Sequence, residues 1–341
     1  MLKTRLFQAA AVLAIGALAM TGCTNKNSSG SASGSANTGT KTVAFVPKLQ
    51  GIPYFEAMNA GGKKAADELG IKWLYQGPTT ADAAAQADIV RSFIQQKVDT
   101  LIVAPNDPDS MAPLLKQAQD AGIKVATADT DAPNSVRQVF VNQTTEENHG
   151  KALSESLMKA MGGSGEFAIV SCSETAANLN AYIDVIKKDV AANHPDAKLV
   201  DLVYAGEDQA KAAAMATDLM NAHPNLKGIV GLCSAAAPGV AQAVKDAGKI
   251  GKVFTVGGGT PMAMAPYLKD GSSSAAVLWD VQNLGYLTAW TGKELADGKQ
   301  LQPEFDVNAT IKGVKYDPAT KVELLGPPLV FTKDNVDQYK Y

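Results

Sequence analysis

TVAFVPKLQGIPYF, residues 42–55, joins a short apolar run to the start of an amphipathic one. The run at 42–47 is hydrophobic without alternation, as is typical of a parallel strand that is covered on both faces. Pro53 fits the first turn of a helix, where its missing N–H costs nothing. The segment therefore predicts a buried strand, a loop that carries Lys48, and a helix that opens with Tyr54 and Phe55.

The same alternation of apolar runs and longer Ala-rich amphipathic runs continues along the chain and then begins again. Asp120-Ala121-Gly122 and Asp246-Ala247-Gly248 each end an amphipathic run before a candidate strand, at nearly equal spacing within the two halves. Glycine is a common C-cap, and the shared context indicates two lobes of one design. We predict an α/β fold of two Rossmann-like, doubly wound lobes with parallel sheets. The predicted strands are 42–47, 72–75, 100–104, 124–128 and 138–141, then 167–171, 199–204, 228–232, 252–256 and 275–279.

The N-terminus has the pattern of a lipoprotein export signal. Lys3 and Arg5 precede an apolar run at 7–20, and small residues lead into Cys23. We expect residues 1–23 to be a signal peptide that is cut before Cys23, which is then lipidated; the alternative is an uncleaved membrane anchor. Residues 24–40 are rich in Ser, Gly, Asn and Thr, and we expect them to be a flexible tether.

Composition excludes several classes of protein. The net charge is −3 and the basic residues are scattered, so nothing favours a nucleic-acid partner. The histidines lie beside helix-end signals, and we expect no metal site and no cofactor; these residues are His149, His194 and His223. We expect a monomer.

In an open parallel sheet, ligands bind beyond the carboxyl ends of the strands. The loops at these ends carry aromatic faces mixed with carboxylates, amides and hydroxyls, which together suit a sugar or polyol. Asp131 is expected to cap a turn. The candidate ligand-binding residues are Lys48, Tyr54, Phe55, Asp129, Asn142, Asn178, Asn180, Ser234, Gly259, Trp279 and Asp280.

Three segments carry a resemblance to a known family: 45–55, the strand and loop at 127–131, and Leu278-Trp279-Asp280-Val281. They resemble the sugar-binding proteins of ABC importers, a type I periplasmic-binding-protein family, and are most similar to its rhamnose-binding and autoinducer-2-binding branch. The resemblance implies that the chain crosses between lobes three times, near 141–142, 280–281 and 309–311. The lobes would then be 41–141 with 281–309, and 142–280 with 310–341.

The resemblance also implies a function: an extracytoplasmic protein, anchored by the Cys23 lipid, that hands a small carbohydrate to an ABC transporter permease. By it, Lys48, Asp129 and the pair Tyr54-Phe55 match ligand contacts of the autoinducer-2 branch. The chain departs from that branch at Asn178-Leu179, where the branch has Asp-Gln, and at Leu232-Cys233. Because these departures remove hydroxyl-binding groups, we expect a pentose, hexose, deoxyhexose or polyol instead of autoinducer-2.

Two questions stay open at the level of sequence. Cys172 and Cys233 end the first and third strands of the second lobe, which the usual 2-1-3-4-5 order makes neighbours, so they form either a disulfide or two free thiols. The alternatives to solute binding are a carbohydrate-active enzyme with Asp129 and Asp280 as its carboxylates, a receptor for an autoinducer-2-like signal, or a transcription regulator. The enzyme is disfavoured because the sequence has no nucleophile elbow or phosphate-binding loop, and the regulator because an export signal is present.

Overall fold

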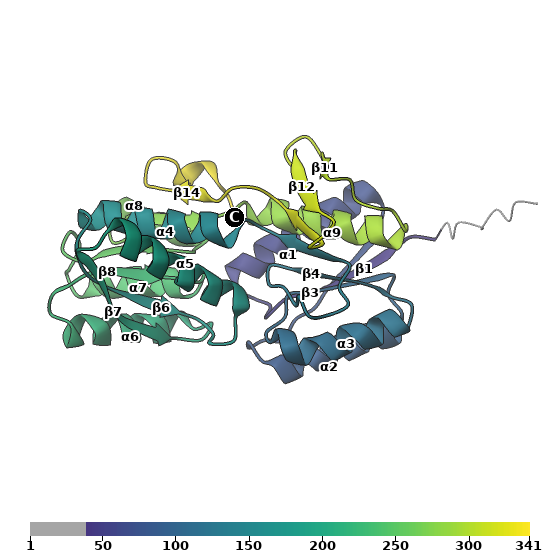
Figure 1. The fold of residues 1–341 in the computed structure, drawn as a ribbon, viewed down its shortest axis with the longest axis horizontal. Coiled ribbons are helices and arrows are strands. Elements are labelled where there is room, and N and C mark those ends of the chain that lie inside the picture. The colour runs from purple at the N-terminus through teal and green to yellow at the C-terminus, as the bar shows by residue number, and fades with distance from the viewer. Residues whose placement is uncertain (1–38) are drawn as a thin grey trace, which may run out of the picture. The chain divides into compact units, whose positions relative to one another are not determined.

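The structure is a computed structural model that describes residues 39–341. The predicted signal peptide, the lipidated Cys23 and nearly all of the tether lie outside the described residues. From residue 40 to 341 the chain forms one compact unit, built from two α/β lobes (Figure 1). None of the helices in this unit is long and apolar enough to span a membrane.

The first lobe is built on a sheet with the strand order β11-β12-β13-β5-β4-β3-β1-β2. Its parallel part, β2-β1-β3-β4-β5, has the expected 2-1-3-4-5 order, and all its strands were predicted to within about one residue. Helices α1 and α9 pack against each other on one face, and α2 and α3 cover the other (Figure 1). The elements are β1 (Thr42–Val46), α1 (Pro53–Leu69), β2 (Lys72–Tyr75), α2 (Ala83–Gln96), β3 (Thr100–Val103), α3 (Pro108–Asp120), β4 (Lys124–Ala128), β5 (Val139–Asn142) and α9 (Val281–Ala296).

The second lobe repeats this arrangement around a sheet with the order β14-β10-β9-β8-β6-β7. Its parallel strands were also predicted, with end shifts of one or two residues. Helices α4 and α5 pack together, as do α6 and α7, and α8 contacts α7. The elements are α4 (Glu146–Met161), β6 (Gly165–Ser171), α5 (Ala177–Asn193), β7 (Ala197–Tyr204), α6 (Gln209–Ala222), β8 (Leu226–Gly231), α7 (Ala236–Asp246), β9 (Phe254–Gly257), α8 (Pro261–Asp270) and β10 (Ala275–Leu278).

The C-terminal segment corrects one predicted boundary. Strands β12 (Val314–Asp317) and β13 (Val322–Leu324) belong to the first sheet, where β13 pairs in parallel with β5. The physical reason is that β13 covers the otherwise open edge of β5. The chain then reaches the second sheet at β14 (Leu329–Phe331), which pairs with β10. The third passage therefore falls between Leu324 and Leu329, and not at 309–311, so residues 314–324 lie in the first lobe. The short β11 (Glu304–Phe305) pairs with β12.

The histidines lie near helix ends, as expected. His194 and His223 are the C-caps of α5 and α6, and His149 lies in the first turn of α4.

Two glycines fix how closely α1 and α9 approach. A methyl group at Gly61 would overlap the carbonyl oxygen of Gln282, and one at Gly285 would overlap that of Met58. This close contact matters for the site, because α9 begins two residues after Trp279 and α1 carries Tyr54 and Phe55.

Candidate functional site

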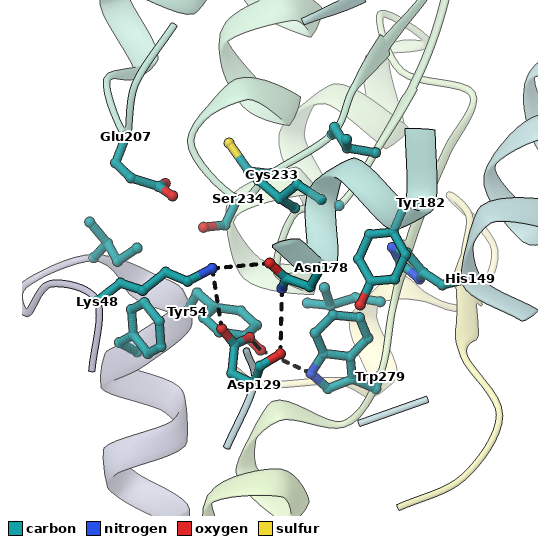
Figure 2. Close-up of a pocket in the computed structure, with 16 residues that line it drawn as sticks. Lys48, Tyr54, Asp129, His149, Asn178, Tyr182, Glu207, Cys233, Ser234 and Trp279 are labelled. Carbon is teal, nitrogen blue, oxygen red and sulfur yellow. Dashed lines mark hydrogen bonds and ion pairs between the residues drawn. The ribbon is translucent and has the colours of Figure 1, made fainter. Parts of the chain in front are cut away.

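A cavity of about 50 Å³ lies where the carboxyl ends of the two sheets meet. The first lobe contributes the loop after β1, the start of α1 and the end of β4. The second lobe contributes α4, α5, the loops after β7, β8 and β9, and the end of β10. The polar and aromatic side chains from the two lobes point toward one another (Figure 2). Seven predicted residues line this cavity: Lys48, Tyr54, Phe55, Asp129, Asn178, Ser234 and Trp279.

Asp129 is the centre of the polar contacts. It follows β4 directly in a left-handed conformation with a φ of 64°, a region that Asp tolerates better than most residues. Its Oδ1 accepts a hydrogen bond of 2.7 Å from the Tyr54 hydroxyl, and its Oδ2 accepts one of 3.1 Å from Thr130. The Lys48 Nζ lies 3.6 Å from the same Oδ2. Since Asp129 and Lys48 are 3% and 7% exposed, this is a buried ion pair.

Asn178, in the first turn of α5, connects the lobes. Its Oδ1 accepts a hydrogen bond of 3.2 Å from Lys48, and its Nδ2 lies 3.4 Å from the carbonyl oxygen of Asp129. Thr175 in the preceding loop donates to the carbonyl oxygen of Asn106 across the same boundary. The ammonium of Lys48 is thus held by one group from each lobe.

Aromatic rings form the other side of the cavity. The Trp279 indole nitrogen donates to the Tyr54 hydroxyl at 3.2 Å, and the two rings meet edge to face. Burial and the neighbouring Asp129 raise the pKa of Tyr54 well above its usual value. The His149 ring lies 4.5 Å from that of Tyr182 and 5.1 Å from that of Trp279, and burial lowers the pKa of His149 to about 3. His149 is therefore a neutral, largely apolar wall of the site at neutral pH.

Glu207 lies in the loop after β7, on the side of the cavity opposite Trp279 (Figure 2). Its Oε2 is closed off from solvent and has no hydrogen-bond partner among the described residues. Burial raises the pKa of Glu207, while the charge of Lys48 partly opposes that rise. In the structure a disulfide joins Cys172 to Cys233, with Cα atoms 6.1 Å apart. Glu207 and both sulfurs lie within 4.8 Å of one another, but sulfurs in a disulfide offer no thiolate to a metal ion.

Four predicted residues lie elsewhere, each for an identifiable reason. Asp280 caps α9, where its Oδ1 accepts from the Asn283 N–H, so the carboxylate pair of the enzyme alternative is not assembled in the cavity. Asn180 donates to the carbonyl oxygen of Glu174, which turns it away from the cavity.

Gly259 and Asn142 are the other two. Gly258, one residue earlier, lines the cavity, and Gly259 faces the side chain of Met264. Asn142 ends β5 and accepts hydrogen bonds from two backbone N–H groups, those of Thr144 and Leu325. It lines a separate hollow at the junction of the lobes.

Several residues of the site were not predicted from the sequence, although two of them carried a signal. Glu207 stands three residues after the predicted strand 199–204, which places it at the same sheet edge as the residues that were found. Tyr182 follows Asn178 by four residues, so the two share one face of α5. His149 gave no such signal, because only the packing of α4 against α5 and β10 brings its ring to the cavity. The other lining residues are Ile52, Leu179, Leu232, Cys233, Gly258 and Leu278.

Comparisons with known proteins agree with this geometry. Residues 43–300 match the model of the periplasmic binding protein domain. The chain is 30% identical to the D-ribose/D-allose-binding protein of Pseudomonas aeruginosa, over 67% of this chain and 74% of that protein. Among solved structures it is 28% identical to LsrB from Clostridium saccharobutylicum in complex with AI-2, with a TM-score of 0.81 over 88% of this chain and 100% of that one. It is also 28% identical to an ABC transporter solute-binding protein from Clostridium phytofermentas with bound L-rhamnose, with a TM-score of 0.82 over 88% and 98% of the two chains. The chain thus belongs to the periplasmic binding proteins of type I, the sugar-binding proteins of ABC transport.

Proposed function

We propose that this protein is an extracytoplasmic lipoprotein that captures one monosaccharide or polyol between its lobes and delivers it to an ABC transporter permease. One observation carries the proposal: the cavity between the lobes brings the polar groups of Lys48, Asp129 and Asn178 together with the rings of Tyr54 and Trp279. Hydroxyl groups can donate to and accept from the first set, while the C–H face of a sugar packs on the second.

Lobe closure is the proposed mechanism. Asn178 reaches Lys48 and the backbone of Asp129 only while the two lobes are together. A ligand that contacts both walls binds the closed form better than an open one, and it therefore shifts the population toward closure. Bending would occur at the three passages between the sheets, after β5, after β10 and after β13.

The wall near α5 and β8 supports a ligand with few hydroxyls on that side. Leu179, Leu232 and Cys233 line the cavity where the autoinducer-2 branch was expected to carry polar groups. A hydroxyl that faced these side chains without a partner would cost about 1 to 3 kcal/mol. We therefore propose a pentose, hexose, deoxyhexose or polyol as the ligand.

An autoinducer-2-like furanosyl signal is the second candidate, because the chain is similar over 88% of its length to LsrB, which was solved with AI-2. Isothermal titration calorimetry with D-ribose, D-allose, D-arabinose, L-rhamnose and AI-2 separates the two. We expect a sugar to bind with a Kd near micromolar, which corresponds to about 8 kcal/mol, and AI-2 to bind at least tenfold more weakly. Tighter binding of AI-2 would reverse the choice of ligand, and no heat with any of the five would contradict the proposed function.

The remaining parts of the proposal have their own tests. The bound sugar should be recovered chemically intact after prolonged incubation, since the proposal is for a binding protein without catalytic activity. Replacement of Cys23 by serine should release the protein from the membrane fraction. Recovery of a converted sugar would favour the enzyme alternative, and a Cys23→Ser protein that stays in the membrane fraction would contradict lipid anchoring.

A further inference from the structure

We infer that Glu207 contacts the ligand and selects sugars that present a hydroxyl or ammonium donor to it, while it rejects sugars that carry a carboxylate or phosphate. The inference rests on the proposed function and deepens it, because it concerns the chemical class of the ligand at the same site.

The backbone on both sides of Glu207 is held by hydrogen bonds, which fix the point from which its side chain projects. The Gly206 N–H donates to the carbonyl oxygen of Cys172 at 2.9 Å, and Asp208 caps α6 by accepting from the Lys211 N–H. The disulfide at Cys172 lies beside this loop. With its backbone tied in this way, Glu207 projects its carboxylate into the cavity (Figure 2).

No structural role accounts for this carboxylate. Its Oε2 is shielded from solvent and receives no hydrogen bond from the described residues. A buried polar atom without a partner costs about 1 to 3 kcal/mol. If Glu207 bound no ligand, an apolar residue such as leucine would therefore suit this position better. A hydroxyl or ammonium donor on a ligand in the cavity would supply the missing partner.

The charges in the cavity decide which ligands fit. Lys48 is the basic group of the lining, and Asp129 and Glu207 are its carboxylates. The ammonium of Lys48 already has Asp129 at 3.6 Å and Asn178 at 3.2 Å. An anionic sugar would thus add negative charge to a cavity whose one ammonium is already paired with a carboxylate, and like charges placed close together repel.

The position of Glu207 also indicates which part of the ligand it contacts. In Figure 2, Glu207 and Trp279 lie on opposite sides of the cavity. A sugar ring that packs on Trp279 and Tyr54 would direct its far substituents toward Glu207 and the disulfide. The donor that Glu207 accepts is therefore on the edge of the sugar remote from the stacked face.

The test combines two variants with a charge-matched panel. Wild type, Glu207→Gln and Glu174→Gln are titrated by calorimetry with D-ribose, D-allose, D-arabinose and L-rhamnose, and with D-glucose, D-glucosamine, D-glucuronate and D-ribose 5-phosphate. Glu174 is the matched control, because it is an exposed carboxylate in the loop after β6, outside the cavity lining. Unfolding in urea verifies that each variant is folded.

We expect every sugar that binds wild type to be uncharged or amine-bearing. Glu207→Gln should weaken binding of the tightest-binding sugar tenfold to a hundredfold. It should also reduce the ratio of affinities between each neutral sugar and its anionic counterpart, D-glucose against D-glucuronate and D-ribose against D-ribose 5-phosphate, because the amide adds a donor and removes a charge. Glu174→Gln should stay within twofold of wild type. Tighter binding of an anionic sugar than of its neutral counterpart by wild type, or unchanged affinities in Glu207→Gln, would overturn the inference and leave the proposed function standing. A wild type that binds no member of the panel would contradict the proposed function itself.

Discussion

Replacing Asp129 by alanine should remove ligand binding and also destabilise the fold strongly, because Asp129 neutralises a buried ammonium. Lys48 is 7% exposed, and its Nζ lies 3.6 Å from the Asp129 carboxylate. Breaking a buried ion pair by removing one partner costs about 3 to 5 kcal/mol. The Tyr54 hydroxyl also loses its acceptor at 2.7 Å, and alanine is disfavoured at a φ of 64°. Since these groups share one network, their costs overlap, and we expect a total loss of about 4 kcal/mol.

Two further variants separate the causes. Asp129→Asn keeps an acceptor for Tyr54 and a residue type that tolerates left-handed backbone, so it should lose less stability than Asp129→Ala. The double variant Lys48→Met/Asp129→Ala removes both charges, and replacement of a whole buried pair by apolar groups is often neutral or stabilising. It should therefore be more stable than Asp129→Ala alone by about 2 kcal/mol or more, although it binds no sugar.

Urea unfolding at pH 7, followed by circular dichroism, measures the stabilities, and calorimetry with D-ribose and L-rhamnose measures binding. Asp129→Ala with wild-type stability would refute the view that Asp129 holds Lys48. A double variant less stable than Asp129→Ala would show that Lys48 stabilises the fold without its partner, which also contradicts the reasoning.

Three other predictions concern the scaffold. Glu323 is fully buried and burial raises its pKa to about 8, so the native state keeps a proton that the unfolded chain loses from pH 4.5 upward. The free energy of unfolding should therefore fall by about 4 kcal/mol between pH 5 and pH 9 because of this group. Urea unfolding should show a smaller fall in Glu323→Gln and an unchanged fall in the exposed control Glu155→Gln. Equal falls in wild type and Glu323→Gln would contradict this prediction. Gly285→Ala should cost more than about 3 kcal/mol in thermal or urea unfolding, because its methyl group would overlap a backbone carbonyl of α1; a wild-type midpoint would show that α1 and α9 separate easily. Alkylation of the denatured, unreduced protein followed by peptide mapping should find Cys172 and Cys233 unlabelled, and labelling of either cysteine before reduction would contradict the disulfide. Reduction should lower the free energy of unfolding by roughly 4 kcal/mol, as calculated for a cross-link that spans 61 residues.

The parallel strands were predictable because each is a short, fully buried run that leaves a continuous apolar signal. TLIV at Thr100–Val103 is buried at every position, and its short length and β-branched residues favour a covered strand over a helix. In contrast, β12 alternates between exposed and less exposed residues over four positions, and β13 has only three residues, of which the fully buried one is Glu323. The family resemblance placed the third passage near 309–311, and strand signals of that length could not correct it, because they do not show which sheet a strand joins.

The candidate site was predictable where one rule applied, that parallel strands present ligand-binding groups at their carboxyl ends. Asp129 and Lys48 follow directly from it, and Glu207 should have been found by it. The rule does not predict where a side chain points. Asp280 lies at the carboxyl edge of the sheet, but its carboxylate caps α9 by accepting a hydrogen bond from a free N–H group of the first turn. His149 could not be found at all, since its ring reaches the cavity only through packing between elements distant in sequence.

The placement of Trp279 gives this protein an intrinsic optical probe. Its indole lies in the cavity, 4% exposed and bonded to the Tyr54 hydroxyl, whereas Trp73 and Trp290 lie in β2 and α9 and are absent from the cavity lining. A ligand that breaks the hydrogen bond between Trp279 and Tyr54 changes the polarity around the Trp279 indole. The fluorescence emission spectrum of the unlabelled protein should therefore report ligand binding in real time. The same residue joins β10 to α9, so the signal originates at the strand-to-helix junction between the second sheet and the first lobe.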